Sequence, residues 1–166
     1  FLKKFDGTVL SLVQGASGDK NYFHWLFDIL PKIIITQSVM SLNKIDYFYM
    51  PELQKFQRKT LSLLGIKNCK FINSKKIKHL EASKIIIPDH PWYYKGTVFK
   101  QANSIPEWII KCLRKLFLKF KKKNNKSLKI FIDRSESDFP HCKLTNNEEI
   151  KKVLSKKGFR IVRTGA

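Results

Sequence analysis

The spacing of apolar and polar residues along the chain predicts strands that alternate with helices. Four short apolar runs have the length of strands: residues 8–13, 46–50, 69–72 and 84–87. Apolar residues at helical spacing predict helices over 21–42 and 53–64, with Pro31 kinking the first or starting another, and Gly65 ending the second. Strands that alternate with helices indicate βαβ units, so we expect an α/β fold with a mostly parallel sheet.

A further helix is expected over 105–119, where apolar residues recur every three or four positions. The stretch KKKNNK at 121–126 has almost no apolar content and is typical of a solvated linker. We therefore expect a first domain over 1–120, a basic linker over 121–127 and the opening of a second domain over 128–166.

The second domain is expected to open with a β-α-β unit. Strands over 128–132 and 159–162 would flank a helix that Gly158 ends. Thr145 and Glu148 have the spacing of a capping box, in which each side chain bonds the backbone N–H of the other residue. The apolar residues of this helix predict its buried stripe: Ile150, Val153 and Leu154.

The composition indicates a folding chain that is a piece of a longer protein. Hydrophobic residues make up 43% of the 166 positions, which suits a globular domain, and no apolar run approaches the roughly 20 residues that span a bilayer. The sequence opens at Phe1 without an initiator Met and stops at Ala166, directly after a predicted strand. We therefore expect regions to be missing at both ends.

The formal net charge of +20 suggests a nucleic-acid partner at first sight. However, only five of the 33 basic residues are Arg, and base readout relies on the arginine fork. A chain rich in Lys, Ile, Asn and Phe is what an AT-rich genome encodes. Nucleic acid is therefore not the expected partner, and a basic module that binds nucleic acid or another polyanion stays as an alternative.

The segment NYFHWLFDILPK at 21–32 places polar residues inside a strongly apolar helix. Asn21, His24 and Asp28 share one helical face, whereas Trp25 lies on the side that faces the core. A carboxylate one turn after an imidazole can fix its tautomer and raise its basicity. On spacing alone, a structural His–Asp hydrogen bond is the favoured interpretation, and a base with its orienting partner is the alternative.

A second candidate site is the loop after the strand at 128–132, since ligands of α/β sheets bind beyond the carboxyl ends of strands. Arg134 follows this strand end and can hold a phosphate through two parallel hydrogen bonds. Pairing of Arg134 with Asp133 or Glu136 on the surface explains its position equally well.

The sequence has none of the common motifs for metal binding, nucleotide binding or hydrolysis. The three cysteines are scattered, and the sequence has no CxxC, HExxH, Walker, GxSxG or DxD motif. We therefore expect neither a disulfide framework nor a bound metal.

Two segments resemble glycosyltransferase family 61, whose bacterial members are capsular polysaccharide biosynthesis proteins. NYFHWLFDILPK is similar to a family signature of Asn, two aromatic residues, His-Trp-Leu, a nearby acidic residue and Leu-Pro. KIFIDRSESDFPHCKLTNNEEIKKVLSKKGFRIV is similar to another signature, which runs from an apolar strand through Ser-Arg, a basic pair and Asn-Glu-x-Glu to a helix ending in Gly-Phe. Both stand in the order and spacing of the family and cover about a third of the chain.

The resemblance implies a GT-B-like fold, with a Rossmann-type parallel-sheet first domain and the opening β-α-β of a second Rossmann-like domain. It implies inverting, metal-independent transfer of a sugar from a nucleotide-sugar donor, expected to be UDP-linked, to a glycan or lipid-linked acceptor. His24 and Asp28 would be catalytic, with Asn21 and Trp25 on the acceptor side of the cleft. The implied donor-binding residues are Arg134, near the diphosphate, and Lys143, Asn146 and Glu149.

The chain departs from the family pattern at three points. Asp133 stands in place of the usual Ser, Cys142 stands where the family tends to have Arg, and a third signature ending in His-Gly-Ala-Gly is absent. The fragment is therefore expected to be inactive alone.

The expected location is cytoplasmic, and peripheral attachment to the inner face of the membrane is an alternative. The helix starting at 105 combines an apolar face containing Trp108 and Phe117 with basic residues, as an interfacial helix on an anionic membrane does. Packing of this helix on the sheet is the favoured interpretation.

Overall fold

The chain forms two units in a computed structural model. The structure describes residues 1–13, 21–67, 69–92, 95–97, 100, 104–119, 128–135 and 144–163. The units are Phe1–Lys121 and Lys122–Ala166, and each has a sheet of its own. The predicted linker at 121–127 lies outside the described residues.

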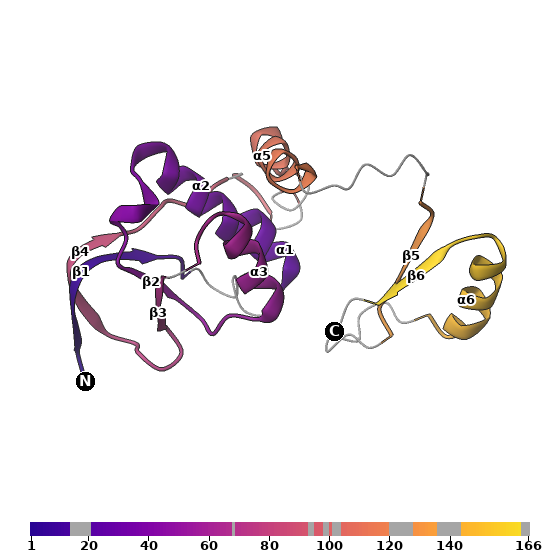
Figure 1. The fold of residues 1–166 in the computed structure, drawn as a ribbon, viewed down its shortest axis with the longest axis horizontal. Coiled ribbons are helices and arrows are strands. Elements are labelled where there is room, and N and C mark those ends of the chain that lie inside the picture. Colours follow the sequence, from indigo (N-terminus) through magenta and orange to yellow (C-terminus); the bar gives the residue numbers. More distant parts are fainter. Residues whose placement is uncertain are drawn as a thin grey trace. The chain divides into compact units, whose positions relative to one another are not determined.

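The first unit is built on a four-stranded parallel sheet in the order β3-β2-β1-β4 (Figure 1). Its strands are β1 (Lys3–Ser11), β2 (Tyr47–Met50), β3 (Lys70–Asn73) and β4 (Leu80–Ile86). The predicted α/β class with a parallel sheet is therefore confirmed. β1 and β4 start earlier than predicted, because Lys3–Phe5 pairs with Leu80–Ala82 beyond the apolar runs.

The helices of this unit share one hydrophobic core with the sheet. Those that the structure describes in full are α1 (Tyr22–His24), α2 (Leu30–Val39), α3 (Lys55–Leu63) and α5 (Glu107–Leu118), with a π-helical turn η1 (Trp25–Ile29) and a 3₁₀ turn η2 (Leu42–Lys44). Leu10 and Phe48 are paired across β1 and β2, so they lie on the same face of the sheet. Their core cluster includes Trp25 and also Ile109 and Leu113 of α5, so α5 packs on this core.

Pro31 shapes the helix that follows β1. α1, η1 and α2 run without a break, and the Leu30 N–H bonds the Trp25 carbonyl five residues back. Pro31 has no N–H to donate to Phe27 O, four residues earlier. The wider π-helical turn places Pro31 in the first turn of α2, where a missing N–H costs least. Of the two predicted alternatives, this is the one in which Pro31 starts a further helix.

The second unit is a β-α-β unit, as predicted. β5 (Ile130–Asp133) and β6 (Arg160–Arg163) are parallel, and α6 (Asn147–Lys156) joins them. The helix ends before Gly158, which has a φ of 80° and so adopts the left-handed conformation that glycine tolerates.

Two details predicted for α6 are wrong. Its N-cap is Asn146 and makes no side-chain cap hydrogen bond, whereas Glu148, of the predicted capping box with Thr145, is paired with Lys151. The predicted stripe of Ile150, Val153 and Leu154 is not buried, and Val153 is 53% exposed. A two-stranded sheet is too narrow to bury a helix face.

Candidate functional site

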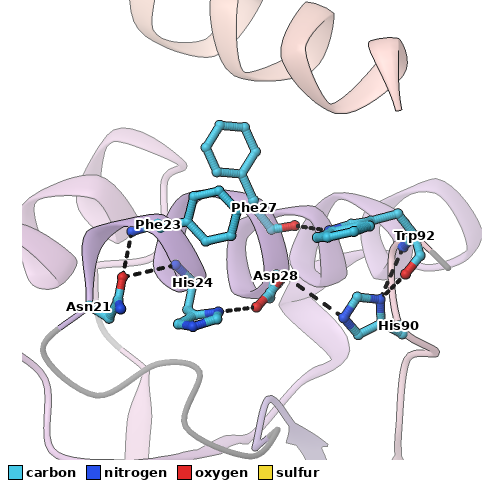
Figure 2. Close-up of polar contacts among 7 residues, drawn as sticks. All are labelled: Asn21, Phe23, His24, Phe27, Asp28, His90 and Trp92. Carbon is cyan, nitrogen blue, oxygen red and sulfur yellow. Dashed lines mark hydrogen bonds and ion pairs between the residues drawn. The ribbon is translucent and has the colours of Figure 1, made fainter. Parts of the chain in front are cut away.

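The candidate site lies at the point where the strand order of the sheet reverses. β1 leads to β2 and then β3 on one side, whereas β4 lies on the other side of β1. Open α/β sheets bind ligands at the carboxyl ends of the strands at such a switch point. The segments that follow β1 and β4 bring His24 and Asp28 together with His90 there (Figure 2).

His24 and Asp28 are joined as the helical spacing predicted. His24 Nδ1 lies 2.7 Å from Asp28 Oδ2. The Asp28 side chain is 6% exposed and the His24 side chain is 36% exposed, so the carboxylate is buried and the imidazole reaches solvent. An ionised carboxylate holds the proton on Nδ1, which leaves Nε2 as the basic nitrogen.

Asn21 and Trp25 have structural positions on either side of His24. Asn21 Oδ1 accepts from the N–H groups of Phe23 at 2.9 Å and His24 at 3.4 Å, which caps the helix (Figure 2). Trp25 is fully buried and donates from Nε1 to Thr60 Oγ1 at 2.8 Å. The expectation that Trp25 lines an open cleft is therefore wrong, because the core takes the ring and α3 supplies its hydrogen-bond acceptor.

His90 and Trp92 were missed by sequence reasoning. His90 Nε2 lies 3.9 Å from Asp28 Oδ1. Trp92 Nε1 donates to Phe27 O at 3.3 Å (Figure 2). Phe27 O is the carbonyl that Pro31, which has no N–H, leaves without its usual helical donor. The segment DHPW at 89–92 gives no signal of this role. His90 and Trp92 reach the helix because β4 ends beside β1, and the local sequence does not determine that strand order.

A buried lysine lies one turn beyond Asp28. Lys32 is 4% exposed. Burial lowers its pKa, and the negative charges of Asp28 and Asp89 act in the opposite direction. The helix therefore presents an imidazole, a carboxylate and an ammonium group on successive turns.

In the second unit, Asp133 supports the end of β5 and does not pair with Arg134. Asp133 is 2% exposed and accepts from Ser135 N at 3.0 Å, Asn147 Nδ2 at 3.1 Å and Lys151 Nζ at 2.9 Å. The hydrogen bond from Lys151 is the main cause that holds the pKa of Asp133 well below its usual range. Pairing with Asp133 therefore does not explain the exposed Arg134.

The other predicted donor-binding residues are only partly described. Asn146 and Glu149 are exposed at the start of α6, and among the described residues no interaction joins them to Arg134. Lys143 and Glu136 lie outside the described residues, as do Cys142 and its neighbours.

The described part of the chain shows neither a metal site nor a membrane span. Within it, no group of three or more His, Cys, Asp or Glu side chains could hold a metal ion. None of its helices is long and apolar enough to cross a membrane.

Comparison with known proteins gives no match, whether with family models, curated proteins or solved structures. The case for a function therefore rests on the geometry of the site and on the two sequence segments.

Proposed function

We propose that the chain is part of an inverting glycosyltransferase that moves a sugar from a UDP-linked nucleotide sugar to a hydroxyl of a glycan or lipid-linked acceptor. The observation that carries the proposal is the His24–Asp28 pair, joined at 2.7 Å, at the switch point of a parallel sheet. In a GT-B arrangement, the first unit would be the acceptor side and the second unit the donor side.

His24 is the proposed general base. Its Nε2 takes the proton of the acceptor hydroxyl while the oxygen attacks the anomeric carbon from the face opposite the diphosphate. The bond from that carbon to the diphosphate oxygen breaks as the glycosidic bond forms. The Asp28 carboxylate holds the imidazole in place and stabilises its protonated form.

Arg134 is the proposed partner of the leaving diphosphate. It is exposed at the carboxyl end of β5, and the first turn of α6 presents backbone N–H groups that favour negative charge. These groups would stabilise the charge that develops on the leaving group without a metal ion. Lys143, Asn146 and Glu149 are the further proposed donor contacts.

The test is acceptor-dependent release of UDP from a panel of UDP-sugars by the product of the complete open reading frame. Arg134→Ala should lower kcat/KM for the donor by about tenfold or more, because a charge-assisted contact to phosphate is lost. Arg160→Ala, at an exposed position of β6, is the matched control and should retain activity. Equal rates for the two variants would contradict the role of Arg134.

One observation favours a second, non-catalytic function, which is binding to an anionic membrane surface or another polyanion. α5 exposes apolar Ile110 and Leu118, which are 43% and 48% exposed, beside exposed cations: Lys111, Arg114, Lys115 and Lys119. Pelleting with vesicles that contain anionic lipid tests it, with neutral vesicles as the control. Binding to nucleic acid would be detected separately, as an affinity for DNA or RNA that falls steeply with salt.

A further inference from the structure

The two carboxylate oxygens of Asp28 have different surroundings. Oδ2 is joined to His24, whereas Oδ1 is buried and has no hydrogen-bond partner among the described residues. A buried acceptor of this kind is unfavourable until a donor reaches it. His90 Nε2 lies 3.9 Å from Oδ1, on the side away from His24 (Figure 2).

The contacts of the His90 ring decide which of its nitrogens can turn an N–H toward Asp28. Its Nδ1 lies against both the N–H and the carbonyl oxygen of Trp92, with the N–H nitrogen at 3.3 Å. If Nδ1 accepts from the N–H, the neutral ring carries its proton on Nε2. If Nδ1 instead donates to the carbonyl, the neutral ring turns the Nε2 lone pair toward the carboxylate and makes no hydrogen bond to it. The first arrangement is the one that turns an Nε2–H toward Asp28 Oδ1.

The Trp92 side chain, two residues after His90, bonds the same turn of the helix. Trp92 Nε1 donates to Phe27 O at 3.3 Å, one residue before Asp28. The segment after β4 therefore contacts η1 at two consecutive residues. Both contacts are long for hydrogen bonds, and such contacts in unliganded sites often tighten when the substrate binds.

We propose that His90 is a positioning residue, whose Nε2–H closes on Asp28 Oδ1 to complete a His24–Asp28–His90 array. Asp28 is then held from both sides, so its Oδ2 keeps the His24 ring in the tautomer and orientation that present Nε2. Lys32 is a further charged group that interacts with Asp28, and Asp89 also acts on Lys32. The effect on turnover rests on the proposed function, whereas the hydrogen-bond array does not.

Nitrogen-15 NMR of the histidine rings tests the array without any activity measurement. The chain has four histidines, so long-range proton–nitrogen spectra resolve each ring. We expect a proton on His90 Nε2 in the wild type, and a neutral His90 ring protonated only on Nδ1 would overturn the proposal.

Variants extend the NMR test to His24. His90→Leu should move the His24 nitrogen signals toward a mixture of tautomers, whereas His90→Gln, whose amide can still donate, should keep them. His79→Leu, at an exposed position, is the matched control and should change nothing. If His90→Leu does not fold, His90→Gln provides the test in its place. A folded His90→Gln variant that loses the wild-type His24 signals would overturn the proposal.

Turnover of the complete protein gives the second readout. His90→Leu should lower kcat about tenfold, within the range of general-base effects, with the KM of the donor unchanged. In a His24→Ala background, it should cost nothing further, because His90 acts through His24; losses that multiply would overturn the proposal. If the wild type transfers no sugar, the proposed function fails, and the NMR result still decides the array.

Discussion

Trp25 fixes the site helix to α3, and its replacement tests this attachment. The indole is fully buried, and its Nε1–H donates to Thr60 Oγ1 at 2.8 Å. The Thr60 hydroxyl in turn donates to Gln57 O at 2.8 Å. Trp25→Phe removes the donor and part of the ring, and leaves Thr60 bonded to its own helix.

The expected loss follows from two terms. The hydrogen bond contributes about 1 kcal/mol to the free energy of unfolding. The cavity left by the missing ring atoms adds about 1–2 kcal/mol, on the scale of small deletions in a core. We therefore expect Trp25→Phe to lower the free energy of unfolding by about 2–3 kcal/mol.

Urea unfolding followed by far-ultraviolet circular dichroism measures this loss, and a double-mutant cycle isolates the hydrogen bond. Thr60→Val should be costly alone, because it leaves a buried indole N–H without an acceptor, and much less costly once Trp25 is Phe. The coupling expected is about 1 kcal/mol. As a control, Trp25→Phe and Thr36→Val should be additive, because Thr36 bonds Lys32 O. Additive effects of Trp25→Phe and Thr60→Val would refute the reasoning.

Two further predictions concern the pH dependence of stability. Because burial lowers the pKa of Lys32 in the folded chain, its ionised form is disfavoured there, so Lys32→Met should raise the melting temperature at neutral pH. The difference in melting temperature between Lys32→Met and the wild type should shrink as pH rises toward the ordinary lysine pKa of 10.5. A difference that stays constant with pH would contradict the lowered pKa of Lys32. Asp133 has a lowered pKa, mainly because Lys151 donates to it. The ionised Asp133 therefore stabilises the folded state fully above its ordinary pKa, and this stabilisation is lost as pH falls below that value. Asp133→Asn should therefore reduce hydrogen-exchange protection of α6 at neutral pH but have little effect in strong acid, and equal protection at neutral pH would speak against the contact.

The His24–Asp28 pair was predictable from the sequence, whereas its surroundings were not. Residues four apart on a helix meet whatever the rest of the fold does. The π-helical turn depends on the N–H that Pro31 lacks. Phe27 O, which loses its usual helical donor there, accepts from Trp92 Nε1, 65 residues later. No local pattern carries such a contact.

The strand arrangement explains the other successes and failures. Alternating strands and helices were enough to predict a parallel sheet, because that topology leaves few choices. The position of β4 beside β1 was not predictable, and this position brings His90 to Asp28. In the second unit, the apolar spacing of α6 predicted burial that two strands cannot supply, so Val153 stays exposed.

The most direct test of the central claim is the turnover of His24→Ala in the product of the complete open reading frame. The readout is acceptor-dependent transfer from the best UDP-sugar, with His79→Ala as the control for loss of an exposed histidine. If His24 is the general base, its loss should reduce kcat by more than about tenfold while His79→Ala keeps the wild-type rate. A His24→Ala enzyme that transfers sugar at the wild-type rate would contradict the account.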